Sequence, residues 1–365
     1  MREGWEYKKL GQVCTSDLGK TLNKSKDRGE LHPYLCSINI LWDKIDLSTL
    51  KQACFEAGEQ EKYTVRKGDL LVCEGGDTGR SAIWDRDETI LYQNALHRLR
   101  FHDSVFPKFV LFYLMYLKDI GEIDNKYSKG VTIKHLVKKA LLSIPLPLPP
   151  KPTQLSIVSE LDKLNELIQI KKEQLKDYDA LAQSIFYEMF GDPVENEKGW
   201  EVKKFGDLFK LKSGDGLSSK DFNTGIYPVY GGNGISGYHN SFNMKGCYII
   251  IGRVGVYCGN VRKVDGEFWL TDNAFRLIYK ENEQNPFFIL YLLNILDLHQ
   301  YANAAAQPVI SNLTLKSINV PLPPLSLQQS FAHKIEQIER QKAEVQKTIT
   351  DLESLLAARM QYWFD

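Results

Sequence analysis

Two polar stretches of the chain have the composition of a surface that binds phosphates and base edges. Lysine, arginine and small hydroxyl or amide side chains make most contacts to phosphates, whereas Arg, Asn and Gln also read base edges. A solvated loop would have a similar composition, so both interpretations stay open. The first stretch contains Lys20, Thr21, Asn23, Lys24, Ser25, Lys26 and Arg28, and the second contains Lys212, Ser213, Ser218, Ser219, Lys220 and Asn223.

Two further arginines follow glycines. Arg80 comes shortly after Gly75-Gly76, and Arg253 comes directly after Gly252. Glycine permits a close approach of the backbone to a neighbour or a ligand. We therefore expect Arg80 and Arg253 to be stronger candidates for nucleic-acid contact than the residues of the two loops.

Three motifs resemble those of enzymes, but each lacks a required part. Gly232-Asn-Gly234-Ile-Ser-Gly237 fits a dinucleotide fingerprint, yet no apolar helix period and no acidic residue about 20 positions on follow it, so a glycine-rich hairpin is expected. Gly19-Lys20-Thr21 lacks the upstream glycine of a phosphate loop, because Cys14 stands there. Asn285-Pro-Phe-Phe288 only partly matches a methyltransferase motif, so Asn285 is expected to cap a helix.

No arrangement of side chains with metal-ligand spacing is found, and no catalytic triad can be identified from residue order. We therefore expect neither a metal nor a cofactor bound by this chain, and no active site of its own. The cysteines form no Cys-x-x-Cys pair and are expected to be free, buried thiols. They are Cys14, Cys36, Cys54, Cys73, Cys247 and Cys258.

The elements that position these residues occur twice. Trp5-Glu-Tyr-Lys-Lys-Leu-Gly11 returns as Trp200-Glu-Val-Lys-Lys-Phe-Gly206, and Asn94-Ala-Leu-His-Arg-Leu99 returns as Asn273-Ala-Phe-Arg-Leu277. The period, near 180 residues, is too long for a solenoid, so the sequence indicates a duplicated domain and a pseudo-two-fold molecule. Each copy contains short β-branched and aromatic runs and one apolar helix, which predicts mixed α and β structure.

Each copy ends in a proline-rich segment followed by a long helical stretch. The segments are Ser143-Ile-Pro-Leu-Pro-Leu-Pro-Pro150 and Ser317-Ile-Asn-Val-Pro-Leu-Pro-Pro324, with Thr153 and Ser326 as possible N-caps. Apolar residues then recur at alternating intervals of three and four, which is typical of a coiled-coil seam. The predicted contact residues are Leu161, Leu164, Ile168, Leu175, Tyr178 and Ile185 in the first helix and Ile335, Ile338, Val345, Ile349, Leu352 and Leu356 in the second.

The polar exceptions on this seam include Lys171 and Lys342. A helix from Leu155 to Phe190 would be about 54 Å long at 1.5 Å per residue. The alternative is that each helix packs only on its own domain.

Composition and charge restrict the class of protein further. The chain has 365 residues, 43% hydrophobic and 25% charged, which excludes wholesale disorder and favours two domains. Its net charge is zero, which divides into +3 for residues 1–150, −4 for 151–198, +2 for 199–324 and −1 for 325–365. The longest apolar runs are too short to cross a membrane and no signal peptide is evident, so a cytoplasmic protein is expected.

Taken together, these residues resemble the specificity subunit of type I restriction-modification systems over essentially the whole chain. The segments that carry the resemblance are Tyr34-Leu35 with Asn39 and Trp42, Gly68 to Gly76 with Gly79-Arg80, Tyr227 to Gly234, Ile251 to Gly255 with Cys258-Gly-Asn260, Gln307 to Ser311, and both Pro-Leu-Pro-Pro runs with Gln154 and Gln328. The first proline run, from Pro145, is two residues longer than the second, which leaves the helix register open.

The resemblance implies an α+β fold with two target-recognition domains in a pseudo-two-fold arrangement, separated by two long helices that form an antiparallel coiled coil. The domains would be residues 1–150 and 193–324, and the spacer helices residues 151–192 and 325–365. Such a subunit reads a bipartite target in double-stranded DNA and recruits two methyltransferase subunits, which use S-adenosylmethionine, and endonuclease-translocase subunits. The predicted DNA-contacting set is Lys20, Thr21, Asn23, Lys24, Lys26, Arg28, Asn39, Arg80, Lys129, Lys212, Ser218, Lys220, Asn233, Tyr238, Arg253 and Gln307.

Two other classes of function compete with this hypothesis. A scaffold of related architecture would hold protein partners without touching DNA, and a salt-dependent binding assay separates it from a DNA-binding subunit. A nucleic-acid enzyme with its methyltransferase or nuclease in the same chain would act alone on DNA, but the cofactor and metal motifs of such an enzyme are not found.

Overall fold

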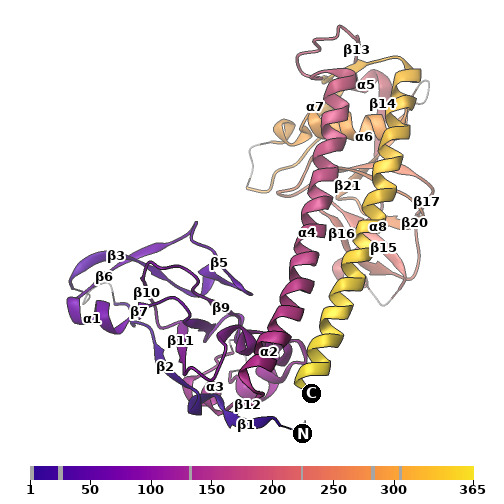
Figure 1. The fold of residues 1–365 in the computed structure, drawn as a ribbon. Helices are drawn as coiled ribbons and strands as arrows, with labels where there is room; N and C mark the ends of the chain where they lie inside the picture. The colour runs from indigo at the N-terminus through magenta and orange to yellow at the C-terminus, as the bar shows by residue number, and fades with distance from the viewer. Residues whose placement is uncertain (1–3, 24–27, 131–133, 223–224, 281–283, 304–305) are drawn as a thin grey trace. The chain divides into compact units, whose positions relative to one another are not determined.

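The computed structural model of the chain describes residues 4–23, 28–130, 134–222, 225–280, 284–303 and 306–365. The chain divides into two compact units, of which the first contains residues 1–171 and 348–365 and the second contains residues 172–347. Each unit holds one sheet-rich domain and a part of two long helices, α4 (Lys151–Phe190) and α8 (Leu325–Phe364) (Figure 1). In the described part of the chain, no helix has the length and apolar character needed to span a bilayer.

Two four-stranded sheets form the first domain. One is antiparallel with the order β2-β11-β8-β9, and the other, with the order β6-β3-β10-β7, contains the parallel pair β3 and β10. Two-stranded sheets join β1 to β12 and β4 to β5. The strands are β1 (Glu6–Lys9), β2 (Cys14–Leu18), β3 (Glu30–Leu35), β4 (Ile40–Leu41), β5 (Lys44–Ile45), β6 (Lys51–Phe55), β7 (Thr64–Val65), β8 (Leu70–Cys73), β9 (Ser81–Ile83), β10 (Ile90–Tyr92), β11 (Leu96–Phe101) and β12 (Pro145–Leu148).

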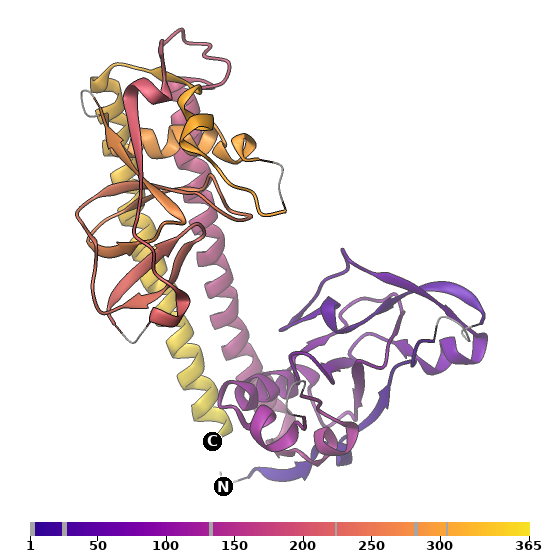
Figure 2. The ribbon, with the colours of Figure 1, turned by 180° about the vertical axis from the view of Figure 1, so that it is seen from behind.

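The second domain, pink to orange in Figure 2, repeats the strand order of these two four-stranded sheets. Its antiparallel sheet has the order β14-β21-β18-β19, its second sheet has the order β16-β15-β20-β17 with β15 and β20 parallel, and β13 pairs with β22. The duplication predicted from the sequence is therefore confirmed at the level of strand order. The strands are β13 (Glu201–Lys204), β14 (Phe209–Ser213), β15 (Tyr227–Gly231), β16 (Gly234–His239), β17 (Met244–Lys245), β18 (Tyr248–Gly252), β19 (Val261–Val264), β20 (Glu267–Leu270), β21 (Ala274–Tyr279) and β22 (Asn319–Leu322).

One apolar helix packs into the core of each domain. It is α2 (Pro107–Asp119) in the first domain and α6 (Pro286–Ile295) in the second, and each begins with a proline, whose fixed φ suits the first helical position. The Asn285 side chain accepts hydrogen bonds from the backbone N–H groups of Phe287 and Phe288, so it is the predicted N-cap. The short helices are α1 (Ala57–Lys62), α3 (Lys138–Ser143), α5 (Phe205–Leu208), α7 (Asn312–Lys316), η1 (Leu10–Gln12), η2 (Ser37–Asn39), η3 (Ile123–Tyr127), η4 (Ser219–Asp221) and η5 (Leu298–Tyr301).

The long helices begin at Lys151 and Leu325, so Thr153 and Ser326 lie within their first turns and are not their N-caps. The carbonyl of Pro150 accepts the first backbone bond of α4, from Thr153, and the carbonyl of Pro324 accepts that of α8, from Leu327. Both proline-rich exits form four-residue strands, and both helices have 40 residues. The longer proline run of the first exit therefore does not change the length of either element.

A buried glutamine lies in the first turn of each long helix. Gln154 accepts a bond from the Phe106 N–H and donates to the carbonyls of Ser104 and Pro149. Gln328 accepts a bond from the Asn285 N–H and donates to Gln284 Oε1 and to the carbonyl of Pro323. Each glutamine thus ties a long helix to the segment that precedes the apolar helix of the same unit.

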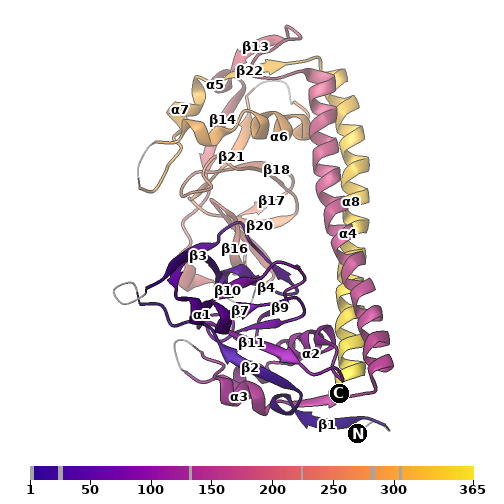
Figure 3. The ribbon, with the colours of Figure 1, turned by 60° about the vertical axis from the view of Figure 1, so that its left-hand side comes forward.

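The two long helices pair in an antiparallel manner within each unit (Figure 3). In the first unit, Arg359 of α8 forms an ion pair with Glu160 of α4. In the second, Lys342 lies 2.7 Å from Asp179, and the rings of Phe186 and Phe331 meet edge to face with centroids 5.6 Å apart. All the predicted seam residues are buried or half-buried. The helices also pack on the domains, because Met360 and Phe364 join the first core and Phe186, Phe190 and Phe331 join the second.

Candidate nucleic-acid interface

Three loops of the second domain converge: the turn 231–234 between β15 and β16, the loop 253–260 between β18 and β19, and residues 306–311. A Cβ atom on Gly252 would lie 2.3 Å from the carbonyl oxygen of Gly232, so these backbones meet as closely as the glycines permit. The Gly255 N–H donates to the Pro308 carbonyl, and the Ile310 N–H donates to the Arg253 carbonyl, both at 2.9 Å. The loops that carry Asn233, Arg253 and Gln307 are thereby brought together.

Two guanidinium groups give this loop cluster a positive charge. Arg253 donates to the carbonyl of Asp272 at 3.4 Å and lies 5.4 Å above the Phe275 ring. Its buried Nε has no hydrogen-bond partner among the described residues. Arg262 is exposed and donates to the carbonyl of Asn233 at 3.4 Å. The exposed guanidinium of Arg262 on β19, the half-exposed one of Arg253 and the exposed amide of Asn233 are suited to phosphates and base edges.

A second polar group lies along the edge strand β16. The segment η4 packs on this strand, because the ring of Phe222 occupies the space that a side chain at Gly237 would need, and the ring of His239 bonds to the carbonyl of Asp221 at 3.2 Å. Ser218, Lys220 and Tyr238 are exposed there. Lys212 is also exposed but lies on β14 in the other sheet. Asn223 lies outside the described residues.

The first domain has the corresponding loop cluster. Arg80 donates to the carbonyl of Ser37 at 2.9 Å, and the backbone of His135 bridges both Gly75 and Lys129. Arg80, like Arg253, has a buried Nε that has no hydrogen-bond partner within the described ranges. Arg80 and exposed Lys129 therefore belong to one group of loops, which matches the group around Arg253.

Lys20 and Asn39 are structural residues rather than surface ligands, contrary to their place in the predicted DNA-contacting set. Lys20 is 4% exposed, and its ammonium lies 2.7 Å from both Glu59 Oε2 and the carbonyl of Cys54. The carboxamide of Asn39 is fully buried, accepts a bond from the Cys36 N–H and donates to the Asp46 carbonyl. Internal partners occupy these groups, so they are unsuited to contact DNA.

Other members of the first polar stretch are at the surface. Thr21, Asn23 and Arg28 are exposed. Lys24 and Lys26 lie outside the described residues. The stretch begins at the anchor formed by Lys20, whose backbone forms a parallel bridge with Gln93.

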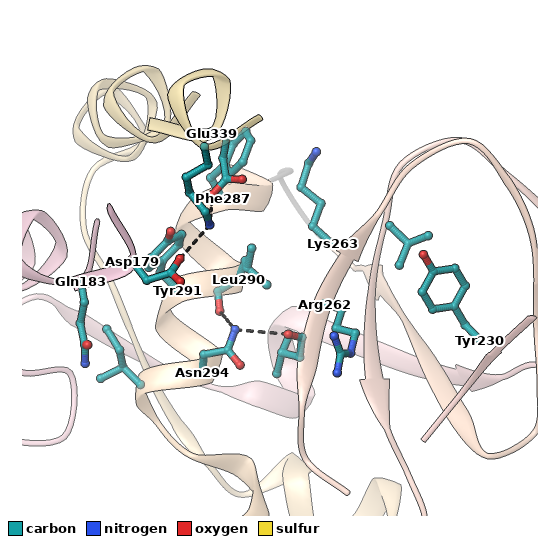
Figure 4. Close-up of a pocket in the computed structure, with 14 residues that line it drawn as sticks. Asp179, Gln183, Tyr230, Arg262, Lys263, Phe287, Leu290, Tyr291, Asn294 and Glu339 are labelled. Atoms are coloured by element: carbon teal, nitrogen blue, oxygen red, sulfur yellow. Dashed lines mark hydrogen bonds and ion pairs between the residues drawn. The ribbon is translucent and has the colours of Figure 1, made fainter. Parts of the chain in front are cut away.

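A pocket of about 910 Å³ lies within the second unit between α4, α6, α8 and β19 (Figure 4). Phe287, Leu290 and Tyr291 of α6 form its apolar wall, and Lys342 contacts both Asp179 and Glu339 at its rim. Burial raises the pKa of Tyr291 to about 12, so its phenol stays protonated at neutral pH. Sequence reasoning missed this pocket because its residues come from five separated elements, including Tyr230 of β15, and only Lys342, a lysine on an apolar seam, indicated it.

The described residues contain no cluster of three or more His, Cys, Asp or Glu side chains able to hold a metal ion. All six cysteines are free, and Cys14, Cys36, Cys73 and Cys258 are buried as predicted. Cys247 is exposed and Cys54 is half-buried, so the prediction of buried thiols is wrong for these two. Burial raises the pKa of Cys14 to about 12, which makes it a poor nucleophile.

The fold defines a class of protein with two copies of a sheet-rich domain, each followed by a long helix. The family model described as "Type I restriction modification DNA specificity domain" matches residues 2–177 and 197–354, so the chain belongs to this family. One relative is the type I restriction enzyme EcoprrI specificity subunit of Escherichia coli, 27% identical over 60% of this chain and 58% of the relative.

Another relative spans nearly the whole chain. The MjaVIII specificity subunit of Methanocaldococcus jannaschii is 22% identical over 97% of this chain and 92% of its own length. The crystal structure of the S subunit of a type I restriction-modification system from M. genitalium covers 99% of this chain, and this chain covers 96% of it. The TM-score is 0.57 at 18% identity, which establishes a common fold.

Proposed function

We propose that the chain is the DNA-sequence specificity subunit of a type I restriction-modification complex and has no chemistry of its own. Each domain would read one half of a bipartite target in double-stranded DNA. The observation that carries the proposal is the duplicated loop cluster, in which the loops 74–80 and 253–260 join corresponding strands in two copies of one topology and carry Arg80 and Arg253 at opposite ends. Family membership and the related specificity subunits support it.

The paired helices would have two tasks. Their seam would set the spacer between the half-sites, and their outer faces would recruit two methyltransferase subunits and, with them, the endonuclease-translocase subunits. S-adenosylmethionine would be bound by the methyltransferase subunits. The mild positive charge of the two domains and the negative charge of the helical segments support this division between DNA and protein partners.

A domain exchange tests the assignment. Replacing residues 1–150 with the corresponding domain of another specificity subunit should change one half of the methylated sequence and leave the other half and the spacer as they are. The measurement is the map of methylated adenines in a host that carries the complete system. A methylation map unaltered by the exchange would contradict the proposal.

Direct binding separates this function from that of a protein scaffold. The complex should bind duplexes that contain its target with an affinity that falls steeply as salt concentration rises, because phosphate contacts release counterions. A complex that assembles with its partners but binds neither target nor random duplexes would be a scaffold.

A further inference from the structure

Two adjacent apolar side chains form the tip of the loop 253–260 in the second domain. Val256 is 75% exposed and Tyr257 is 52% exposed. Single exposed apolar residues are ordinary on protein surfaces. Two neighbouring exposed apolar residues at the end of one loop, beside Arg253, are less common. They indicate a surface that contacts another molecule.

The base of this loop is rigid although its tip is exposed. Gly255 and Gly259, both with φ near +92°, border the tip, and a Cβ atom on Gly259 would lie 2.5 Å from the backbone nitrogen of His299. The N–H of Cys258 donates to the Gly255 carbonyl at 2.9 Å, and the Cys258 side chain is buried. The tip is therefore held in place before any ligand arrives, so binding would cost little conformational entropy.

The surroundings of the tip favour nucleic acid as its partner. The turn that carries Asn233 adjoins the loop through the contact between Gly232 and Gly252. The exposed guanidinium of Arg262 donates a hydrogen bond to the carbonyl of Asn233 in this turn. Positive and amide groups are suited to phosphates and polar base edges. The apolar side chains of Val256 and Tyr257 are suited neither to phosphates nor to polar base edges. The apolar group that a base pair displays in the major groove is the C5-methyl of thymine.

The first domain lacks an equivalent tip. Its corresponding loop, 74–80, contains Gly76 and Asp77 at this place, followed by Thr78, because the Arg80 N–H bonds to the carbonyl of Asp77 as the Asn260 N–H bonds to that of Tyr257. Thr78 is buried and donates to Asp124 at 3.0 Å, while Lys118 holds Asp77 at 2.9 Å. This loop is fastened to its own domain and displays no apolar pair, so the two domains differ in one chemical feature of an otherwise shared loop cluster.

We propose that Val256 and Tyr257 contact the methyl group of a thymine in the half-site read by the second domain. This inference rests on the proposed function and adds to it an apolar element of specificity that the first domain does not have. Loss of one buried methyl group weakens binding roughly fourfold.

The test uses the complete complex and duplexes in which each thymine of the second domain's half-site is replaced, one at a time, by deoxyuridine, which lacks only the methyl group. Affinity should fall roughly fourfold at one such position. The V256S/Y257S double variant should bind the thymine-containing duplex more weakly by at least that factor and should not respond to deoxyuridine. Val194→Ser, which changes another exposed valine, in the turn after α4, should behave as wild type.

The outcomes separate this inference from the proposed function. If the wild-type complex methylates a bipartite site but responds to no deoxyuridine, or if the double variant keeps the wild-type response, the inference is overturned and the function stands. The inference is also overturned if the double variant binds more weakly but deoxyuridine has no effect on the wild-type complex. That result would indicate a side chain inserted between base pairs or a contact with a protein partner. A wild-type complex that recognises no sequence overturns the function itself. Unchanged thermal unfolding of the variants shows that they are folded.

Discussion

Buried polar side chains organise the loops of this protein. Lys20, Asn39, Gln154 and Gln328 are all nine-tenths buried or more, and each bonds to other parts of its own domain. Removing such a side chain leaves its buried partners without a hydrogen bond, which costs more than the bond itself contributes. At this scale the polar residues of the chain divide into those that hold loops in place and those that remain exposed for a ligand.

Lys20→Met tests the structural role of this lysine. The substitution keeps the aliphatic stem but removes the ammonium from Glu59 and from the carbonyl of Cys54. We expect the free energy of unfolding to fall by about 2–3 kcal/mol, since one partner of a largely buried ion pair is lost. Denaturant unfolding measures the change, with exposed Lys44→Met as the control. Equal stability of the two variants would show that the ion pair contributes nothing.

The long helices are stabilised by different contacts in the two units. An ion pair joins α4 to α8 in each unit, between Glu160 and Arg359 in the first and between Asp179 and Lys342 in the second. Phe364 packs on Tyr113 and Tyr116 of the first domain, whereas Phe186, Phe190 and Phe331 form the aromatic cluster of the second unit. The ion pair between Glu160 and Arg359 allows a test by pH, because it lowers the pKa of Glu160.

Glu160→Gln should make the stability of the helix pair less dependent on pH. The Arg359 guanidinium, by hydrogen bonding, holds the pKa of Glu160 below its ordinary value of 4.5. The carboxylate therefore contributes stability above about pH 4.5 that is lost as the pH falls through the lower, folded-state pKa. The effect is small, because both side chains are about one third exposed and water screens them.

The urea midpoints of wild type and Glu160→Gln, measured from pH 7 to pH 3, check this. Their difference should be largest near neutral pH and should vanish at the acidic end. Glu166→Gln, an exposed change on the same helix, serves as the control. A difference that grows as the pH falls would have the wrong sign for this ion pair.

At the scale of the whole molecule, the first compact unit combines two segments distant in sequence, 1–171 and 348–365, whereas the second is the continuous segment 172–347. The chain passes from the first unit to the second within α4 and returns within α8, so neither helix belongs to one domain alone. Under the proposed function, helices shared in this way would set the spacer between the two half-sites.

Inserting seven residues into each helix should lengthen the DNA spacer. Seven helical residues add about 10 Å, which corresponds to about 3 base pairs at 3.4 Å each. We expect methylated sites with unchanged half-sites and a spacer about 3 base pairs longer. An insertion in α4 alone should instead disrupt the seam and abolish methylation. A spacer that stays constant after paired insertions would show that the helices do not set it.

The sequence predicted those parts of the molecule that depend on repetition. The three-four spacing of apolar residues from Leu161 onward and its second copy from Ile335 indicated both long helices and their seam. Such a period can be read along the chain without knowing which residues lie nearby in the fold. Lys20 was misjudged because the residues that bury it, such as Glu59, lie about 40 positions away. The exposed pair Val256-Tyr257 was missed for the opposite reason, since only the packing of Gly259 on η5 shows that the tip is left outside.

The shared construction of the first unit affects the order in which the protein can fold during synthesis. Residues 348–365 complete its core, with Phe364 packed against Phe109 and Tyr113, so residues 172–347 must be translated first. At about 5–20 residues per second this takes about 10–35 s on the ribosome. During that time the first domain exposes an aromatic surface that chaperones can bind. A polypeptide cut short by a premature stop keeps this surface exposed, so chains with only one recognition domain are selectively open to proteolysis.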